Sequence, residues 1–302
     1  MGNNLVPVSR TDKNGKTVVR HVRADTAVLP SSKRIPKPSI APKSVLQSVR
    51  LKEMDSGALT IALLRDIRAM QKEGTVDYDT VFDAMDAAAF LHLHQTRANR
   101  KNLPRTPYIE HPLRNTLRVV RWGCRDEDIL VATLLHDTVE DHSDQIISHY
   151  LGRDDVDSLD ENTKRDLALG WVNDIFGPDV MHLVKAVSND VDNGEKKNEK
   201  QKHAAYAKHV KDKIRNDAKV FLVKFADFVD NAVGLPHNNI PENRESVSRR
   251  ARKYSLVISI FEEEYKSNKG IRDLVDEAGY EAIWEQIQEA KVKLEPLILQ
   301  SA

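Results

Sequence analysis

Apolar residues recur at helical spacing in almost every segment of this 302-residue chain after about residue 50. One such segment runs through Leu59, Leu63 and Ile67, and it should stop at Gly74, because glycine readily takes the left-handed conformation that ends many helices. Strand-like alternation of apolar and polar residues is nearly absent, and no repeat of fixed length occurs. We therefore predict an all-α fold built as a helical bundle.

The same periodicity predicts the further helices of the bundle. They should cover roughly residues 78–93, 111–122, 126–141, 161–176, 178–187, 200–213, 220–234, 242–267 and 273–289. Two highly charged stretches, residues 152–164 and 189–202, should form exposed loops or helix ends.

The first 50 residues differ from the rest in composition. They carry ten Lys or Arg against two acidic residues, and four prolines cluster between residues 30 and 42. No helical or strand period is sustained there. We expect residues 1–50 to be a basic, disordered and largely irregular leader, followed by one all-α domain over residues 51–302.

Charge and cysteine content exclude several classes of protein. Lys and Arg number 46, as do Asp and Glu, so no whole-chain field calls for nucleic acid or an anionic membrane as a partner. No apolar run reaches the roughly 20 residues that a bilayer-spanning helix needs. The single cysteine, Cys124, rules out an internal disulfide framework and fits a reducing compartment. We expect a cytoplasmic protein, and an assembly of identical chains remains open.

Four ionisable residues stand close together in the sequence LLHDTVED at residues 134–141. On one buried helix, His136 would lie over Glu140 and Asp137 over Asp141, because residues four apart share a helix face. Burying such a row costs several kcal/mol unless something compensates it, and a divalent cation is the simplest compensation for a His-Asp pair. The row therefore predicts a metallohydrolase.

Further metal ligands must come from distant segments, because His136 and Asp137 supply only two. The candidates are His111, which precedes a proline at the expected start of a helix, and Asp227, which lies in an apolar run. From the residues alone, a histidine that caps its helix and a salt-bridged core aspartate remain alternatives.

Four motifs in this order resemble the HD-domain phosphohydrolases, and in particular the hydrolase half of the RelA/SpoT family. They are HLHQTR at residues 92–97, TPYIEHP at 106–112, LLHDTVED at 134–141, and KFAD at 224–227 with Asn231 after it. The resemblance spans roughly residues 78–267. Because no synthetase or regulatory module follows, we expect a stand-alone small alarmone hydrolase with an HD-domain helical bundle.

The resemblance implies a metal centre and a pair of catalytic carboxylates. The implied ligands of one divalent ion, typically manganese in this family, are His111, His136, Asp137 and Asp227. Glu140 and Asp141 are implied to be catalytic, and we assign Glu140 to the attacking water and Asp141 to the leaving 3′-oxygen.

The implied substrates are guanosine tetra- and pentaphosphate (ppGpp and pppGpp), cleaved at the 3′ position to pyrophosphate and GDP or GTP. Such charged phosphates need polar and cationic partners, and the family positions near the substrate are Arg97, Lys224 and Asn231.

Two departures from the family pattern bear on the substrate. Ala98 stands where many relatives have a second basic residue, and the acidic stretch 144–169 is longer than in compact relatives. An HD-type hydrolase of another nucleotide, such as ppApp, a nucleoside phosphate or a dinucleotide phosphate, is therefore an alternative. A non-catalytic alarmone-binding or antitoxin protein, which could pair with an alarmone synthetase, is a further one. The presence of both Glu140 and Asp141 favours the hydrolase, because binding alone would not need them.

Overall fold

The computed structural model describes residues 5–11, 17–23, 45–97, 105–189 and 198–299, and its contacts divide the chain into two units, Met1–Val45 and Leu46–Ala302. In the first unit, β1 (Leu5–Thr11) pairs with β2 (Thr17–Arg23) in an antiparallel ladder. Both strands are rich in valine and threonine, which favour extended backbone. This ladder is a local difference from the expected irregular leader.

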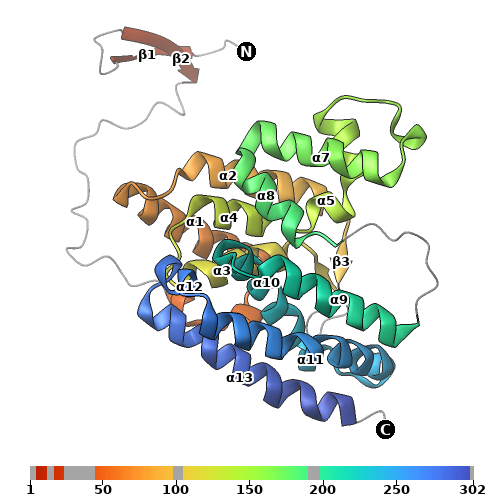
Figure 1. Ribbon diagram of the computed structural model, residues 1–302. Helices are drawn as coiled ribbons and strands as arrows, with labels where there is room; N and C mark the ends of the chain where they lie inside the picture. The colour runs from red at the N-terminus through yellow and green to blue at the C-terminus, as the bar shows by residue number, and fades with distance from the viewer. Residues whose placement is uncertain (1–4, 12–16, 24–44, 98–104, 190–197, 300–302) are drawn as a thin grey trace. The chain divides into compact units, whose positions relative to one another are not determined.

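The second unit is helical, so the predicted all-α fold is confirmed (Figure 1). Its helices are α1 (Ser56–Glu73), α2 (Tyr78–Leu91), α3 (Glu110–Arg121), α4 (Glu127–Leu135), α5 (Thr138–Asp141), α6 (Ser143–Gln145), α7 (Glu161–Phe176), α8 (Pro178–Val187), α9 (Glu199–Ile214), α10 (Ala218–Phe228), α11 (Arg244–Ser267), α12 (Gly270–Leu274) and α13 (Glu277–Leu299). Short π-helical turns cover Ile146–Tyr150 and Val229–Val233, and 3-10 turns cover Val45–Ser48, Leu51–Glu53, Val156–Ser158, Leu235–Asn238 and Pro241–Asn243. The two-residue strands β3 (Thr96–Arg97) and β4 (Thr106–Pro107) pair with each other.

Helix α10 lies in the middle of the bundle, where it contacts α3, α4, α8 and α9 (Figure 1). Its aromatic residues Phe221 and Phe225 are fully buried and stack on each other, and Phe225 also stacks on Trp122 at the end of α3. This packing fixes the end of α10 that carries Asp227 relative to α3, which carries His111.

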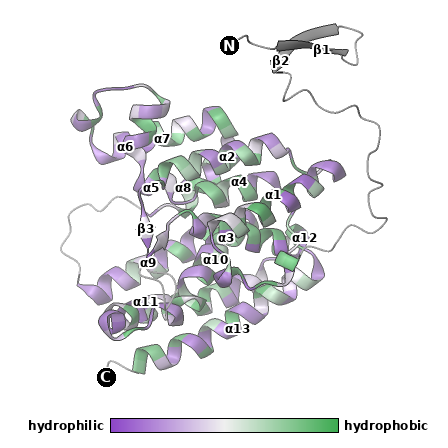
Figure 2. Cartoon of the chain, turned by 180° about the vertical axis from the view of Figure 1, so that it is seen from behind, coloured by the Kyte–Doolittle hydropathy of each residue, from purple (hydrophilic) through white to green (hydrophobic). Residues whose placement is uncertain are grey.

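The C-terminal helices α11 and α13 pack against each other, and α9 packs against α11. Hydrophilic residues dominate α9 (Figure 2), in keeping with its position at the surface of the bundle. The helix predicted at residues 273–289 is instead divided between α12 and α13. A close approach to α3 explains the division, because the Asp276 backbone N–H donates to the Trp122 carbonyl oxygen at 3.1 Å and a Cβ on Gly279 would lie 1.8 Å from that oxygen.

The prediction of one unbroken helix over residues 126–141 is wrong at its centre. Helix α4 ends at Leu135, His136 and Asp137 form a turn, and α5 begins at Thr138. Side chains satisfy two backbone carbonyl groups here: His136 Nδ1 donates to the Thr133 oxygen at 2.8 Å and Thr138 Oγ1 to the Leu135 oxygen at 2.7 Å. Both residues keep right-handed backbone angles, and the His136 and Asp137 side chains approach each other, with Nε2 and Oδ2 3.1 Å apart.

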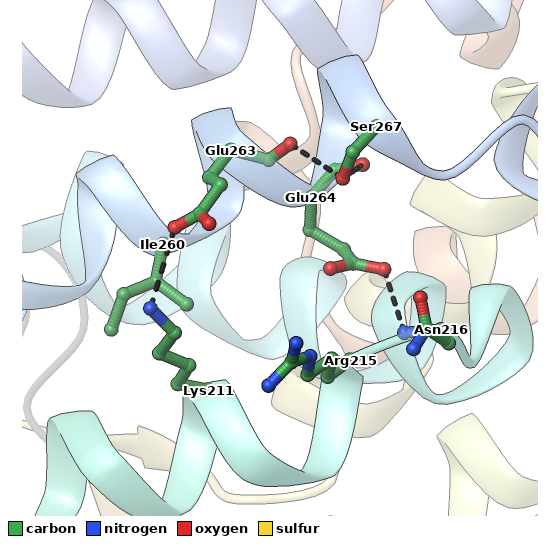
Figure 3. Close-up of a pocket in the computed structure, with 7 residues that line it drawn as sticks. All are labelled: Lys211, Arg215, Asn216, Ile260, Glu263, Glu264 and Ser267. Atoms are coloured by element: carbon green, nitrogen blue, oxygen red, sulfur yellow. Dashed lines mark hydrogen bonds and ion pairs between the residues drawn. The ribbon is translucent and has the colours of Figure 1, made fainter.

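A pocket lies between α9 and α11 and is lined by Lys211, Arg215, Asn216, Ile260, Glu263, Glu264 and Ser267 (Figure 3). Its two carboxylates are engaged within the protein. Glu263 pairs with Lys211 at 3.5 Å, and Glu264 accepts from the Asn216 backbone N–H at 2.9 Å. Among the described helices, none combines the length and the apolar character that crossing a membrane requires.

Candidate active site

Two imidazoles and two carboxylates meet where α3, the α4–α5 turn and α10 come together. The Nε2 atoms of His111 and His136 lie 3.2 Å apart, and Asp137 Oδ2 lies 3.6 and 3.1 Å from them. Asp227 Oδ1 lies 3.1 Å from His111 Nε2 and 3.7 Å from His136 Nε2. The structure thus brings together all four residues predicted as metal ligands, although they span 117 positions of the sequence from His111 to Asp227.

Hydrogen bonds fix the tautomers of both histidines. His136 Nδ1 faces the Thr133 carbonyl oxygen at 2.8 Å, which can only accept, so this nitrogen carries the proton. His111 Nδ1 lies 2.8 Å from Asp230 Oδ2 and likewise donates. In the neutral form of each ring, Nε2 therefore carries the lone pair, and the two Nε2 atoms face the same space, as they do in metal-ligating histidines.

The electrostatics of this group favour a positive charge. Burial opposes the imidazolium form of His136, but Asp137 and Asp227 outweigh burial and raise its pKa well above the usual value. Burial also opposes ionisation of Asp137 and Asp227, yet the two histidines hold the pKa of each carboxyl well below its usual range. Both carboxylates are consequently ionised near neutral pH.

This donor set fits a divalent metal ion. Ligand atoms of His111, His136 and Asp137 lie within 4.8 Å of one another, and Asp227 adds a second carboxylate. At 3.2 Å the two Nε2 atoms require a positive charge between them: the proton favoured on His136 supplies one, and a metal ion can take its place. Nitrogen and oxygen donors without a thiolate suit manganese, iron, zinc or magnesium.

Asp230 is a residue that the sequence analysis missed. Besides His111, its fully buried carboxylate contacts Arg114 Nε at 2.7 Å, Lys52 Nζ at 3.3 Å and Arg118 at 3.4 Å. Burial favours the neutral acid, but Arg114 and Lys52 hold the pKa of Asp230 well below its usual range. The available signal was its position, a second aspartate three residues after Asp227 in an apolar run.

The predicted catalytic carboxylates lie on α5, each held by a different neighbour. Glu140 accepts hydrogen bonds from the backbone N–H of Asn189 at 2.9 Å and from its side-chain amide at 3.0 Å. Asp141 Oδ2 accepts from the Gln95 side-chain amide at 3.0 Å. Burial, opposed by this hydrogen bond, raises the pKa of Asp141. The two carboxylates therefore have different surroundings, which suits different roles.

Two of the three residues predicted to contact substrate are linked to the predicted metal ligands, Asn231 directly and Arg97 through Asn231 and Tyr108. Arg97 donates to Asn231 Oδ1 at 2.6 Å, and Asn231 donates to Asp227 Oδ1 at 2.5 Å. The Arg97 guanidinium also lies over the ring of Tyr108, whose hydroxyl donates to Asp137 at 2.6 Å.

The third residue, Lys224, is placed differently. It is buried and donates to the Val187 carbonyl oxygen at 2.8 Å, so its ammonium group is engaged within the protein. Of the basic residues suggested as extra phosphate contacts, Arg105 binds Thr96 across the β3–β4 pair, and residues 100 and 101 lie outside the described residues.

Helices α9 and α11 add further cationic and aromatic groups that the sequence analysis did not select. Lys253 Nζ lies 3.8 Å from the centre of the Tyr206 ring. Burial lowers the pKa of both Lys253 and Arg250. Lys253 interacts electrostatically with Asp227 and Glu140, and Arg250 interacts with Arg97. No local pattern marks these residues, because helical packing alone brings them near a site formed by earlier segments.

Comparison with known proteins agrees with this geometry. The HD-domain family model matches residues 84–253. The guanosine-3′,5′-bis(diphosphate) 3′-pyrophosphohydrolase MESH1 of Drosophila melanogaster is 30% identical over 157 residues, which cover 52% of this chain and 69% of that protein. MESH1 of Xenopus tropicalis is 30% identical over 159 residues, which cover 51% of this chain and 69% of that protein.

A solved structure is similar at a lower level. It is described as a metazoan orthologue of SpoT that hydrolyses ppGpp, is 23% identical, covers 68% of this chain and 94% of its own, and superposes with a TM-score of 0.44. A likeness at this level carries no functional argument. The HD-domain family model matches more than half of the chain, and this match shows that the chain belongs to the HD-domain family.

Proposed function

We propose that this protein is a metal-dependent 3′-pyrophosphohydrolase of ppGpp and pppGpp, which releases pyrophosphate and GDP or GTP. The observation that carries the proposal is the convergence of His111, His136, Asp137 and Asp227 beside the carboxylate pair Glu140 and Asp141. The two MESH1 relatives, named for this activity, support the choice of substrate. We assign the activity to residues 51–302.

The four converging residues would hold one divalent ion, and we propose manganese. A bound metal lowers the pKa of a coordinated water and polarises a phosphate oxygen. Two carboxylates with two imidazoles, and no thiolate, suit manganese. The hydrogen bonds of the two Nδ1 atoms to Asp230 and the Thr133 carbonyl leave both Nε2 atoms to face the metal, which would take the place of the proton that Asp137 and Asp227 favour on His136.

Glu140 is proposed to orient the attacking water and to accept its proton. A general base must be held in place, and Asn189 does this with two donors to the Glu140 carboxylate. The water attacks the phosphorus that is bonded to the ribose 3′-oxygen. A new bond forms between the water oxygen and this phosphorus, and the bond between the phosphorus and the 3′-oxygen breaks.

Asp141 is proposed to deliver a proton to the leaving 3′-oxygen. This role is favoured by a carboxyl group that holds a proton more readily than an aspartate usually does, and partial desolvation beside Asp137 and Glu140 raises the pKa of Asp141 in this direction. GDP or GTP thereby leaves with a neutral 3′-hydroxyl group.

The phosphates of the substrate are proposed to bind the cationic side of the site. Arg97 is the best placed, because its guanidinium is fixed by Asn231 and Tyr108, and a planar guanidinium can bind two phosphate oxygens at once. These contacts would position the 3′-diphosphate for in-line attack.

The test is to incubate the manganese-loaded protein with ppGpp and, in parallel, with ppApp and a set of nucleoside mono- and triphosphates, and to resolve the products by ion-exchange chromatography. We expect GDP and intact pyrophosphate from ppGpp, and their loss in the Glu140→Gln/Asp141→Asn double variant. The exposed Asp157→Asn variant is the matched control and should retain activity. Cleavage of another nucleotide without turnover of ppGpp would overturn the proposed substrate.

A further inference from the structure

The carboxylate of Asp141 is connected to two buried histidines through the side chain of Gln95. Gln95 Nε2 donates to Asp141 Oδ2 at 3.0 Å. On the other side of the amide, Gln95 Oε1 lies 2.6 Å from His92 Nδ1 and 3.1 Å from His142 Nε2, and these two nitrogens lie 2.9 Å apart. Both histidine residues are less than a tenth exposed.

The two ends of this connection permit only one orientation of the Gln95 amide. If the amide were rotated by half a turn, its oxygen would face the carboxylate of Asp141 at hydrogen-bond distance, where two acceptors repel each other. In the orientation observed, the amide oxygen faces the imidazoles, either of which can donate an N–H to it. The amide N–H is then reserved for Asp141.

Both imidazoles are suited to be neutral anchors. Burial lowers the pKa of His92 to about 4 and also lowers that of His142. The backbone of Gln95 is fixed as well, because its N–H donates to the His92 carbonyl at 3.0 Å and its carbonyl accepts from the Tyr108 N–H at 2.9 Å. The amide therefore extends from a rigid turn and is held at its far end.

A metal ion at His92, His142 and Gln95 is less well supported than a hydrogen-bond network. Ligand histidines almost always donate their second ring N–H to an acceptor, as His111 and His136 do here. His92 Nε2 has no hydrogen-bond partner in the described part of the chain.

We propose that Gln95 is a positioning residue that holds the Asp141 carboxylate in place for proton transfer, and that His92 and His142 keep the Gln95 amide in the orientation this requires. The inference rests on the role proposed above for Asp141. Gln95 acts through Asp141, so its loss lowers turnover while substrate affinity and metal content stay close to those of the wild type. Misplacement of a reacting group by about 1 Å can cost about 100-fold in rate.

The test compares five variants in the manganese-loaded full chain. Gln95→Met keeps the length of the side chain without the amide, and we expect kcat to fall by about 10- to 100-fold with KM nearly unchanged. His142→Leu should lower kcat less, because His92 remains, whereas His142→Gln restores an N–H donor and should recover most of the activity. The Gln95→Met/His142→Leu double variant should be no slower than Gln95→Met alone, since both changes act through one hydrogen bond. His94→Leu changes an exposed neighbour and should behave as the wild type.

A second readout does not depend on activity. In the magnesium-loaded protein, which is diamagnetic, hydrogen exchange of the Gln95 side-chain amide measured by NMR should be slow in the wild type and at least about tenfold faster in His142→Leu. If ppGpp is not cleaved but this change is seen, the proposed substrate fails and the anchoring of Gln95 stands. Additive losses of kcat, or no effect of Gln95→Met, would overturn the inference. The inference would also be overturned if the wild type bound two metal ions per chain and His142→Leu bound only one, because this would indicate a second metal site.

Discussion

Replacing Asp230 by asparagine should weaken metal binding and destabilise the fold, although Asp230 is not one of the proposed metal ligands. The carboxylate accepts from His111 Nδ1 at 2.8 Å and pairs with Arg114, Arg118 and Lys52. An asparagine of the same shape has one acceptor atom, so it can serve His111 or Arg114 but not both. If its amide N–H₂ faces His111, Nδ1 must give up its proton and Nε2 takes one in the direction of the metal.

The magnitude follows from two separate effects. Loss of a hydrogen-bond partner behind a metal-ligating histidine typically costs about 10- to 100-fold in metal affinity, or about 1.4 to 2.7 kcal/mol. Removing one partner of a buried ion pair costs about 3 to 5 kcal/mol of folding stability. The arginines cannot lose their charge, whereas Lys52 can, because burial lowers its pKa to about 7.

The assay is a manganese titration by calorimetry, together with urea unfolding in the presence of a chelator. Lys52→Met is the matched control, because it removes a charge from the same group and leaves the bond between Asp230 and His111. We expect its manganese affinity to stay within about threefold of the wild type. Wild-type affinity in Asp230→Asn would refute the account of how His111 is held.

Three further predictions concern the ligands, the catalytic carboxylates and pH. Changing His136 or Asp137 to alanine should remove bound metal together with activity, as measured by elemental analysis, and unchanged metal content would remove the residue from the ligand set. Glu140→Gln and Asp141→Asn should each retain metal while kcat falls by about 100- to 10,000-fold, and near-normal turnover would contradict the carboxylate mechanism. Burial lowers the pKa of His92 to about 4, so between pH 6.5 and 4 the unfolded chain binds more protons than the folded chain. As the pH falls through this range, the free energy of unfolding of the wild type should therefore drop by up to about 3 kcal/mol relative to that of His92→Phe. Urea unfolding at several pH values measures this difference, and a constant difference would argue against a neutral buried His92.

The sequence was sufficient to predict the helical architecture because the long helices carry periodic apolar faces, and some, such as α1 and α7, also end at a glycine. Gly74 is an example, since it ends α1 in the left-handed conformation expected of it. Boundaries set by contacts with distant segments could not be predicted in this way. The division between α12 and α13 depends on how closely Gly279 approaches Trp122, a contact between residues 157 positions apart.

The site shows the same contrast between local and distant information. His111, His136, Asp137 and Asp227 could be chosen because each lies in a short motif that resembles the family, and the structure brings them together. The break at His136 was missed because helical periodicity is insensitive to one irregular turn. Asn189, which holds Glu140, has no pattern of its own, because its role arises from the packing of α8 against α4.

The most direct test of the central claim is the crystal structure of the Asp141→Asn variant with manganese and ppGpp, with the metal located by its anomalous scattering. We predict one strong peak bonded to His111 Nε2, His136 Nε2, Asp137 and Asp227, and the 3′-diphosphate of ppGpp beside it. A peak elsewhere, or a nucleotide bound with its 3′-diphosphate away from these four residues, would contradict the account.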